Sequence, residues 1–445
     1  MERHDTIAAI ATAPGRAGVA IVRISGPDAF RIAETLSGTL PEPGRFRLSE
    51  IRDGAAATID RAIVLAFGAP RSYTGEDVAE IQCHGGQVTP RRILEACLAA
   101  GARLARRGEF TERAFLNGKI DYSQAESVLD LINAKTERAA DAALSGMEGK
   151  ARRKTRELYE SALELSTTLE YALDVSEDEL PPSFAESVAD RASALDACLG
   201  SAIRQARENK LLRSGALVVL AGAPNAGKSS LMNALLGENR AIVSERPGTT
   251  RDSIEEWLDI DGYPVRLVDT AGMRSTEDAI EAEGVRRTEE LVAKADIVLL
   301  LTPADDPAAA PEPPCGIPGG TLRIGVLTKC DLLHGDGSPC AGRIPVSAKT
   351  GAGLDRLKSE IAARLWSIIA ADGDAAPEER TIAAYIETRK AIAPLVSRPD
   401  GESAPDLVLA ANAVRAAAEK LGVLAGATYS EDLLESLLSR VCVGK

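Results

Sequence analysis

The sequence predicts a multidomain protein of mixed α/β and α type, in which a second α/β domain is inserted into a helical domain. Its 445 residues are enough for two or three domains. Residues 1–118 alternate short apolar runs with segments of helical spacing, and residues 214–370 repeat that alternation. Residues 119–213 and 378–445 are helical in pattern, so we expect one helical domain interrupted by the insertion. Two independent helical domains would give the same pattern.

In the first domain, apolar runs that end in turn residues predict strands, and apolar residues at every third or fourth position predict helices. Arg23 and Glu80 fall within two of these strands. Their pattern alone favours charges that face solvent, because charged side chains are mostly exposed. The expected strands are 6–11, 19–24, 62–67 and 77–84, and the expected helices are 28–36 and 89–100.

Beyond residue 120 the expected helices follow one another, apart from the second α/β domain. A run of acids and prolines at 175–182 interrupts the helical pattern, and residues 371–377 resemble a linker. The expected helices are 121–134, 137–173, 184–213, 354–370, 381–395, 406–421 and 431–440.

The composition favours a soluble protein of the cytoplasm. Seven cysteines are scattered without a metal-binding spacing, which suits a reducing compartment. No segment has the length of a transmembrane helix or the pattern of a signal peptide, so we expect no membrane association. The net charge of −14 argues against broad binding of RNA by this chain alone, because such binding depends on Lys and Arg.

The second α/β domain begins with a phosphate-binding loop, residues 222–229 (GAPNAGKS). An apolar strand precedes the loop and a helix follows it, which is the context that this motif requires. Gly222 and Gly227 let backbone N–H groups point at phosphate oxygens near the helix N-terminus. Lys228 would neutralise phosphate charge, and the Ser229 hydroxyl would ligate Mg²⁺.

Three later strand ends carry the remaining elements of a GTPase. Residues 269–272 (DTAG) would hold Mg²⁺ through Asp269 and sense the γ-phosphate through the Gly272 amide. Residues 328–331 (TKCD) supply Asp331, which can accept hydrogen bonds from guanine N1–H and its amine, a donor pair that adenine lacks. Residues 346–349 (VSAK) would offer a backbone contact to guanine O6. Together with the phosphate loop, these elements predict a Ras-like P-loop GTPase domain.

The chemistry of hydrolysis is less defined by the sequence. Thr250 is expected to complete the Mg²⁺ shell. Met273 stands where Ras-type enzymes have a water-orienting Gln, and its thioether cannot replace that group. Three alternatives stay open for the missing function. Arg274 would act as an internal arginine finger, a cation bound near Asn225 would offset the developing charge, or Glu281 would position the attacking water.

Beyond these motifs, the chain resembles the MnmE (TrmE) family of tRNA-modification GTPases along nearly its whole length. The shared segments are 5–12 (DTIAAIAT), 18–27 (GVAIVRISGP), 72–77 (SYTGED), 83–86 (CHGG), 107–119 (RGEFTERAFLNGK), 124–126 (QAE), 248–252 (GTTRD) and the ending 442–445 (CVGK). Three departures stand out. Thr328 replaces the usual Asn of the guanine motif, and Arg246 and Pro247 stand where the cation loop of the family is more often small or aliphatic. Residues 175–178 (VSED) replace a more usual Asp-Phe-Pro-Glu stretch.

The resemblance implies a dimerising N-terminal domain that binds 5-formyl- or 5,10-methylene-tetrahydrofolate through Arg23, Glu80, Lys119 and Lys445. It also implies K⁺ in the role of an arginine finger and Glu281 as the residue that organises water. The K⁺ would be held by Asn225, Ser244, Arg246 and Thr249. Cys442 would lie near the folate, either as a nucleophile or as a small packed side chain.

Across the motifs and the resemblance, the residues expected to contact GTP and its ions are Asn225, Ala226, Gly227, Lys228, Ser229, Ser230, Ser244, Glu245, Arg246, Pro247, Gly248, Thr249, Thr250, Asp269, Thr270, Ala271, Gly272, Thr328, Lys329, Asp331, Ser347, Ala348 and Lys349.

The family works with the FAD protein MnmG in a heterotetramer. The resemblance therefore implies that this chain helps to install an aminomethyl or carboxymethylaminomethyl group at C5 of wobble uridine, with tRNA bound mainly through the complex. The alternatives are a ribosome-assembly GTPase of the Era or Der type and a scaffold that uses GTP only to change shape. Era and Der proteins share the GTTRD segment, but the sequence shows no KH-like or basic C-terminal region.

Overall fold

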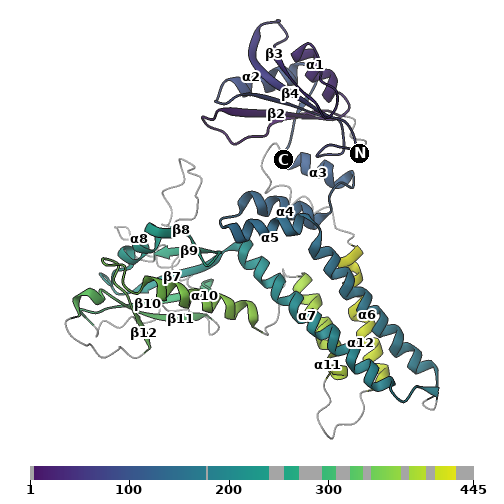
Figure 1. Ribbon diagram of the computed structural model, residues 1–445, viewed down its shortest axis with the longest axis vertical. Helices are drawn as coiled ribbons and strands as arrows, with labels where there is room; N and C mark the ends of the chain where they lie inside the picture. The colour runs from purple at the N-terminus through teal and green to yellow at the C-terminus, as the bar shows by residue number, and fades with distance from the viewer. Residues whose placement is uncertain are drawn as a thin grey trace, which may run out of the picture. The chain divides into compact units, whose positions relative to one another are not determined.

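A computed structural model describes residues 5–176, 179–239, 255–269, 293–306, 321–333, 342–371, 380–396 and 406–426. The chain divides into two compact units (Figure 1). The first contains the chain up to Leu129 together with Gly146–Gly149, and the second contains Asp130–Ser145 and the chain from Lys150 to Ala427. Among the described residues, no helix has the length and apolar character to cross a membrane.

The first unit is built on a six-stranded sheet in the order β3-β4-β5-β2-β1-β6, in which only β1 and β6 pair in parallel. Side chains alternate between the two faces of a strand, so Val22 and Ile24 of β2 enter the core under α1 and α2 while Arg23 faces the other way. The elements are β1 (Ile7–Ile10), β2 (Val19–Ser25), α1 (Ala29–Ser37), β3 (Phe46–Arg52), β4 (Thr58–Phe67), β5 (Val78–His84), α2 (Thr89–Ala99), β6 (Arg103–Leu104) and α3 (Glu109–Leu116).

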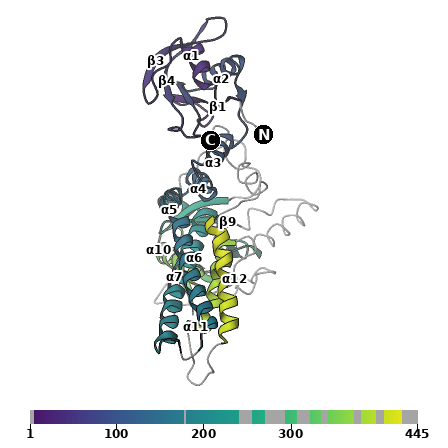
Figure 2. The same ribbon diagram turned by 90° about the vertical axis from the view of Figure 1, so that its right-hand side faces the viewer.

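A bundle of four long helices forms one part of the second unit (Figures 1 and 2). The helix α6 lies along α12, and α7 lies along α11. The Thr155 hydroxyl lies 2.6 Å from the Tyr385 hydroxyl, which joins α6 to α11, and Arg389 of α11 pairs with Asp196 of α7 at 2.7 Å. The helices that follow α3 are α4 (Tyr122–Asn133), α5 (Glu137–Met147), α6 (Lys150–Asp174), α7 (Phe184–Ser214), α11 (Arg380–Val396) and α12 (Leu407–Gly426).

The buried side chains of these four helices form a single hydrophobic core, so the helices before and after the second α/β segment belong to one bundle. The sheet of the second unit is therefore inserted in the chain between α7 and α11. The boundaries that we placed at 118, 213 and 370 stay predictions.

The inserted sheet has the order β12-β11-β10-β7-β9-β8, and every pair is parallel except β8 with β9. The central strands β7, β9 and β10 are buried along almost their whole length and apolar on both faces, as is usual for parallel sheets. The elements are β7 (Ala216–Gly222), α8 (Lys228–Asn239), β8 (Glu255–Ile260), β9 (Tyr263–Asp269), β10 (Ile297–Pro303), β11 (Leu322–Thr328), the 3₁₀ turn η2 (Cys330–Leu332), β12 (Arg343–Pro345) and α10 (Leu354–Ala370).

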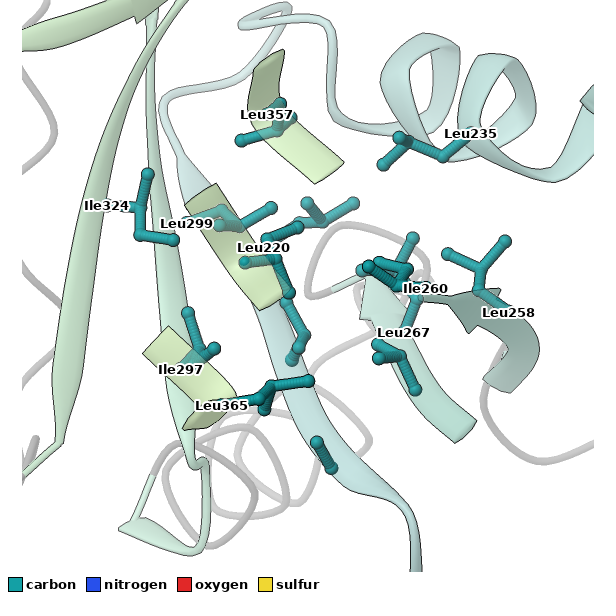
Figure 3. Close-up of a cluster of buried hydrophobic side chains, with 14 of the residues drawn as sticks. Leu220, Leu235, Leu258, Ile260, Leu267, Ile297, Leu299, Ile324, Leu357 and Leu365 are labelled. Carbon is teal, nitrogen blue, oxygen red and sulfur yellow. The ribbon is translucent and has the colours of Figure 1, made fainter. Parts of the chain in front are cut away.

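One face of this sheet packs on α8 and α10 (Figure 3). Leu220 and Leu299 from the central strands meet Leu357 and Leu365 of α10, and Leu235 of α8 reaches the same core. Because β7, β9, β10 and β11 are parallel, their carboxyl ends meet at one edge of the sheet, where ligands bind in folds of this class.

The element predictions are wrong at several places, and the expected helix 431–440 lies outside the described residues. The strands β3 and β6 and the helix α3 were missed, and β4 begins four residues earlier than expected. In β3 the alternation of apolar and polar residues stops after Ser49. The expected helix 137–173 is two helices, because Gly149 adopts a left-handed φ of 70° between α5 and α6.

Candidate functional site

The phosphate-binding loop joins the end of β7 to the start of α8, as its sequence predicted. A Cβ at Gly222 would lie 2.8 Å from the carbonyl oxygen of Leu301, so only glycine allows the loop to leave the sheet here. Gly227 and Asn225 both adopt left-handed φ, 87° and 62°. The buried Lys228 donates from Nζ to the carbonyl oxygens of Gly222 at 2.8 Å and Ala223 at 2.9 Å. Its charge is thus held against the loop that would receive phosphate.

Next to this loop, a hydroxyl and a carboxylate converge. Ser229 Oγ, in the first turn of α8, donates to Asp269 Oδ2 at 2.7 Å. Asp269 is 1% exposed at the end of β9, and β9 pairs directly with β7. Oxygen ligands of this kind are the ones that Mg²⁺ prefers, so the pair fits the predicted metal. Ser230 is exposed in the same turn.

The predicted guanine-reading loop follows β11. The buried Thr328 donates from Oγ1 to the carbonyl oxygen of Ala226 at 2.6 Å, so it ties this loop to the phosphate loop. Lys329 has a left-handed φ of 58°, and its Nζ pairs with Asp305 at 2.8 Å. Asp305 belongs to none of the sequence motifs, although it lies just beyond the carboxyl end of β10, next to β11.

Asp331 is exposed and accepts a hydrogen bond from the Ser347 hydroxyl at 2.6 Å. This hydrogen bond holds the pKa of the Asp331 carboxyl below its usual range, so the group stays an acceptor. Ser347 is buried and also accepts from the amide of Thr350 at 3.2 Å, while Ala348 is half-buried and Lys349 is exposed. The structure therefore brings the predicted base-reading residues together.

Several predicted residues lie outside the described part of the chain. They are Ser244, Glu245, Arg246, Pro247, Gly248, Thr249, Thr250, Thr270, Ala271, Gly272, Glu281, Cys442 and Lys445.

In the first unit, Arg23 and Glu80 face each other on β2 and β5 and form an ion pair at 2.8 Å. Their side chains are 17% and 12% exposed, so the interpretation as solvent-facing charges is wrong. The Arg23 guanidinium also lies 5.4 Å from the ring centroid of Tyr73. Lys119 Nζ donates to the carbonyl oxygen of Pro70 at 2.9 Å, so it reaches the same β4–β5 loop that carries Tyr73.

This loop is held by a buried cation, Arg113, that was not among the predicted site residues. Arg113 of α3 is 1% exposed and pairs with Asp5 at 2.8 Å and with Glu76 at 3.1 Å. Glu76 in turn accepts from the Ser25 hydroxyl at 2.7 Å. The sequence contained a signal for Arg113, because the residue stands among the apolar positions of α3 with acidic residues nearby. A charged side chain at such a position is buried only when it is paired.

The predicted phosphate loop, the Ser229–Asp269 pair and Asp331 of the predicted guanine motif follow strands whose carboxyl ends lie at one sheet edge, which is the arrangement of a P-loop GTPase. Residues 6–119 match the family described as GTP-binding protein TrmE N-terminus, and residues 122–442 match the MnmE helical domain. The chain belongs to the MnmE family of tRNA modification GTPases, because these two family models match most of it and relatives of that name align with it over nearly their full length.

Three relatives carry the name tRNA modification GTPase MnmE. The protein of Symbiobacterium thermophilum is 43% identical and covers 99% of this chain and 100% of its own length. Those of Azoarcus and Alkalilimnicola ehrlichii are 41% and 42% identical, cover 99% of this chain, and match over 98% and 100% of their own lengths. A solved G domain of FeoB from Methanococcus jannaschii is 25% identical, with a TM-score of 0.25, over 34% of this chain and 97% of that domain.

Proposed function

We propose that this GTPase acts in the modification of wobble uridine in tRNA. With an FAD-dependent partner of the MnmG type, a homodimer of this chain would add an aminomethyl or carboxymethylaminomethyl group at C5, in the cytoplasm. The observation that carries the proposal is the contact of Thr328 with Ala226, which joins the loop of Asp331 to the phosphate loop of Lys228, in a chain whose full-length relatives are named tRNA modification GTPases. A ribosome-assembly role of the Era or Der type is not retained, because the family match spans the chain.

At the GTPase site, each group has a defined task. Asp331 would accept from guanine, and Lys228 and the helix N-terminus would offset phosphate charge. Ser229 and Thr250 would hold Mg²⁺, with Asp269 acting through water. Mg²⁺ would neutralise the charge that develops on the phosphate oxygens. Glu281 would position the attacking water.

A K⁺ ion held by Asn225, Ser244, Arg246 and Thr249 would take the place of an arginine finger. The exposed position of Asn225 in the phosphate loop supports this proposal, because it leaves the side chain accessible to a cation.

The test of the cation is GTP hydrolysis by the purified protein in KCl and in NaCl at equal ionic strength. We expect a large K⁺-specific acceleration. Asn225→Gly keeps the left-handed backbone and removes the amide oxygen, so it should abolish the preference for K⁺ while GTP still binds. Equal rates in both salts for the unmodified protein would contradict the proposed ion.

For the first unit we propose a tetrahydrofolate site formed by Arg23, Glu80, Lys119 and Lys445, with Cys442 nearby. The cofactor would supply the one-carbon unit. The pterin edge of the folate requires hydrogen-bond acceptors, and its glutamate tail requires cations. Glu80 provides an acceptor, and Arg23 and Lys119 provide cations. Arg23→Met with Glu80→Gln should abolish binding of 5-formyl-tetrahydrofolate in equilibrium dialysis and leave GTP hydrolysis unchanged. Retained folate binding would exclude these residues.

The modification itself is tested in cells. Deletion of the gene should remove the modified wobble nucleoside from total tRNA, as measured by mass spectrometry, and unchanged tRNA nucleosides would overturn the proposal.

A further inference from the structure

The hairpin β8–β9 connects the nucleotide site to a distant point of the second unit. Residue 255, where β8 begins, follows the segment that carries Thr250, and β9 ends at Asp269. The two strands pair without interruption from Glu255 with Val268 to Ile260 with Tyr263. Seven residues of strand span about 20 Å, at roughly 3.3 Å per residue. A paired hairpin of this length can carry a displacement from its Asp269 end to its turn.

The turn of this hairpin is fastened to the start of α5. Thr136 Oγ1 donates to the carbonyl oxygen of Gly262 at 2.7 Å, and Arg138 Nη1 donates to that of Asp261 at 3.4 Å. Gly262 has a left-handed φ of 81°, and a Cβ there would lie 3.1 Å from Cβ and Cδ of Arg138. The turn is therefore shaped for this contact as well as for the reversal of the chain.

The Arg138 guanidinium joins the hairpin to the helical bundle. It lies 4.3 Å from the ring centroid of Tyr263 and forms an ion pair with Glu208 of α7. Tyr263 is 4% exposed and belongs to the sheet core, whereas α7 contributes Leu195 and Leu199 to the core of the bundle. One side chain thus contacts the inserted sheet and a bundle helix together.

The other strand of the hairpin is held at the same end of α7. Lys135 Nζ lies 5.9 Å from the ring centroid of Trp257 on β8. Gly215, which ends α7, has a left-handed φ of 70°, and a Cβ there would lie 2.4 Å from the Trp257 ring. The hairpin is accordingly held from both strands, by α5 and by the end of α7.

From these contacts we infer that Thr136 and Arg138 are positioning residues for tRNA modification. They bind the β8–β9 turn to α5 and α7, and so pass the nucleotide state of the GTPase site to the helical bundle. The inference rests on the GTPase assignment and on the proposed role in tRNA modification, and not on the proposed K⁺ or folate; hydrogen exchange tests the relay separately from the modification.

The test compares hydrogen exchange of the full-length protein with GDP and with GDP–aluminium fluoride. In the unmodified protein we expect exchange in peptides from α7 (Phe184–Ser214) to differ between the two states. In the double variant Thr136→Val, Arg138→Met this difference should fall at least twofold, while the difference in peptides of the phosphate loop persists. The rate of GTP hydrolysis should stay within about threefold, and the modified nucleoside restored to a deletion strain should fall at least fivefold.

The matched control is Arg156→Met, which removes an exposed arginine paired with Glu160 on α6 and should behave as the unmodified protein. Arg138→Lys keeps the charge for Glu208 and should retain part of the α7 response, which supplies a second variant if the double variant unfolds. Three results would overturn the inference. They are a nucleotide response in α7 that the double variant retains, no such response in the unmodified protein, and a uniform rise in exchange with a parallel loss of hydrolysis.

Discussion

At the scale of single residues, we predict that Asp331 determines which base the site accepts. Its carboxylate can accept from the two donors of guanine, whereas an Asn amide would present a donor to one of them. Xanthine carries a carbonyl where guanine has its amine, and the Asn amide can donate to that carbonyl. Asp331→Asn should therefore lower GTP affinity roughly 100-fold or more and favour XTP. Competition with a fluorescent nucleotide measures both affinities, and unchanged GTP affinity would show that Asp331 does not read the base.

The Ser347 hydroxyl sets the pH range over which Asp331 works. Because the hydrogen bond lowers the pKa of Asp331, its acceptor form persists as pH falls below the usual range of a carboxyl group. Ser347→Ala returns that pKa towards its ordinary value. The acid limb of GTP binding should then move to higher pH, as followed by titration of affinity between pH 3 and 7. A profile that does not move would contradict this role for Ser347.

At the scale of elements, the start of α10 depends on Gly353. This residue has a φ of 78°, and a Cβ there would lie 2.0 Å from the carbonyl oxygen of Pro345, at the end of β12. The left-handed backbone alone costs a larger residue about 1–2 kcal/mol. Gly353→Ala should therefore lower the free energy of unfolding by at least that amount in urea denaturation.

Gly237 provides a control of opposite sign. It lies within α8, and a Cβ there would meet nothing within 4 Å. Gly237→Ala should raise the stability of the helix by about 1 kcal/mol, because glycine has the lower helix propensity. Equal effects of the two substitutions would show that the steric environment of Gly353 has been misjudged.

The elements themselves could be predicted to the extent that local patterns define them. The phosphate loop and α10 follow from glycine placement and apolar spacing, and α10 has the predicted bounds. The strand β3 was missed because it lies at the edge of its sheet with five of its seven residues exposed, which weakens the hydrophobic signal. The burial of Arg23 and Glu80 depends on register between two strands, and a single strand's pattern does not contain that information.

At the scale of the whole molecule, the two helical stretches could be predicted from the sequence, but their packing into one bundle could not. Local periodicity shows that a helix has an apolar face, and it does not show which distant helix covers that face. The pairing of α6 with α12 joins residues more than 200 positions apart. Such long-range pairing makes the bundle depend on helices from both sides of the inserted sheet. Among the described residues of the four bundle helices, the core of the sheet includes Leu211 and Leu212 of α7, and its other buried residues lie outside the bundle.

This division of cores leads to a prediction about the two parts of the second unit. Leu169 of α6 is fully buried in the bundle, so Leu169→Ala should cost about 2–5 kcal/mol of bundle stability, including the cavity that it leaves. Leu163 of the same helix is 45% exposed, and Leu163→Ala should cost much less.

Urea unfolding followed by circular dichroism measures the loss of helix, and fluorescent-nucleotide binding reports on the inserted domain in the same samples. Because the sheet core does not include Leu169, we expect nucleotide affinity to persist at urea concentrations where the bundle of Leu169→Ala has unfolded. Simultaneous loss of helix and nucleotide binding would mean that the contacts of Thr136 and Arg138 make the two cores unfold as one.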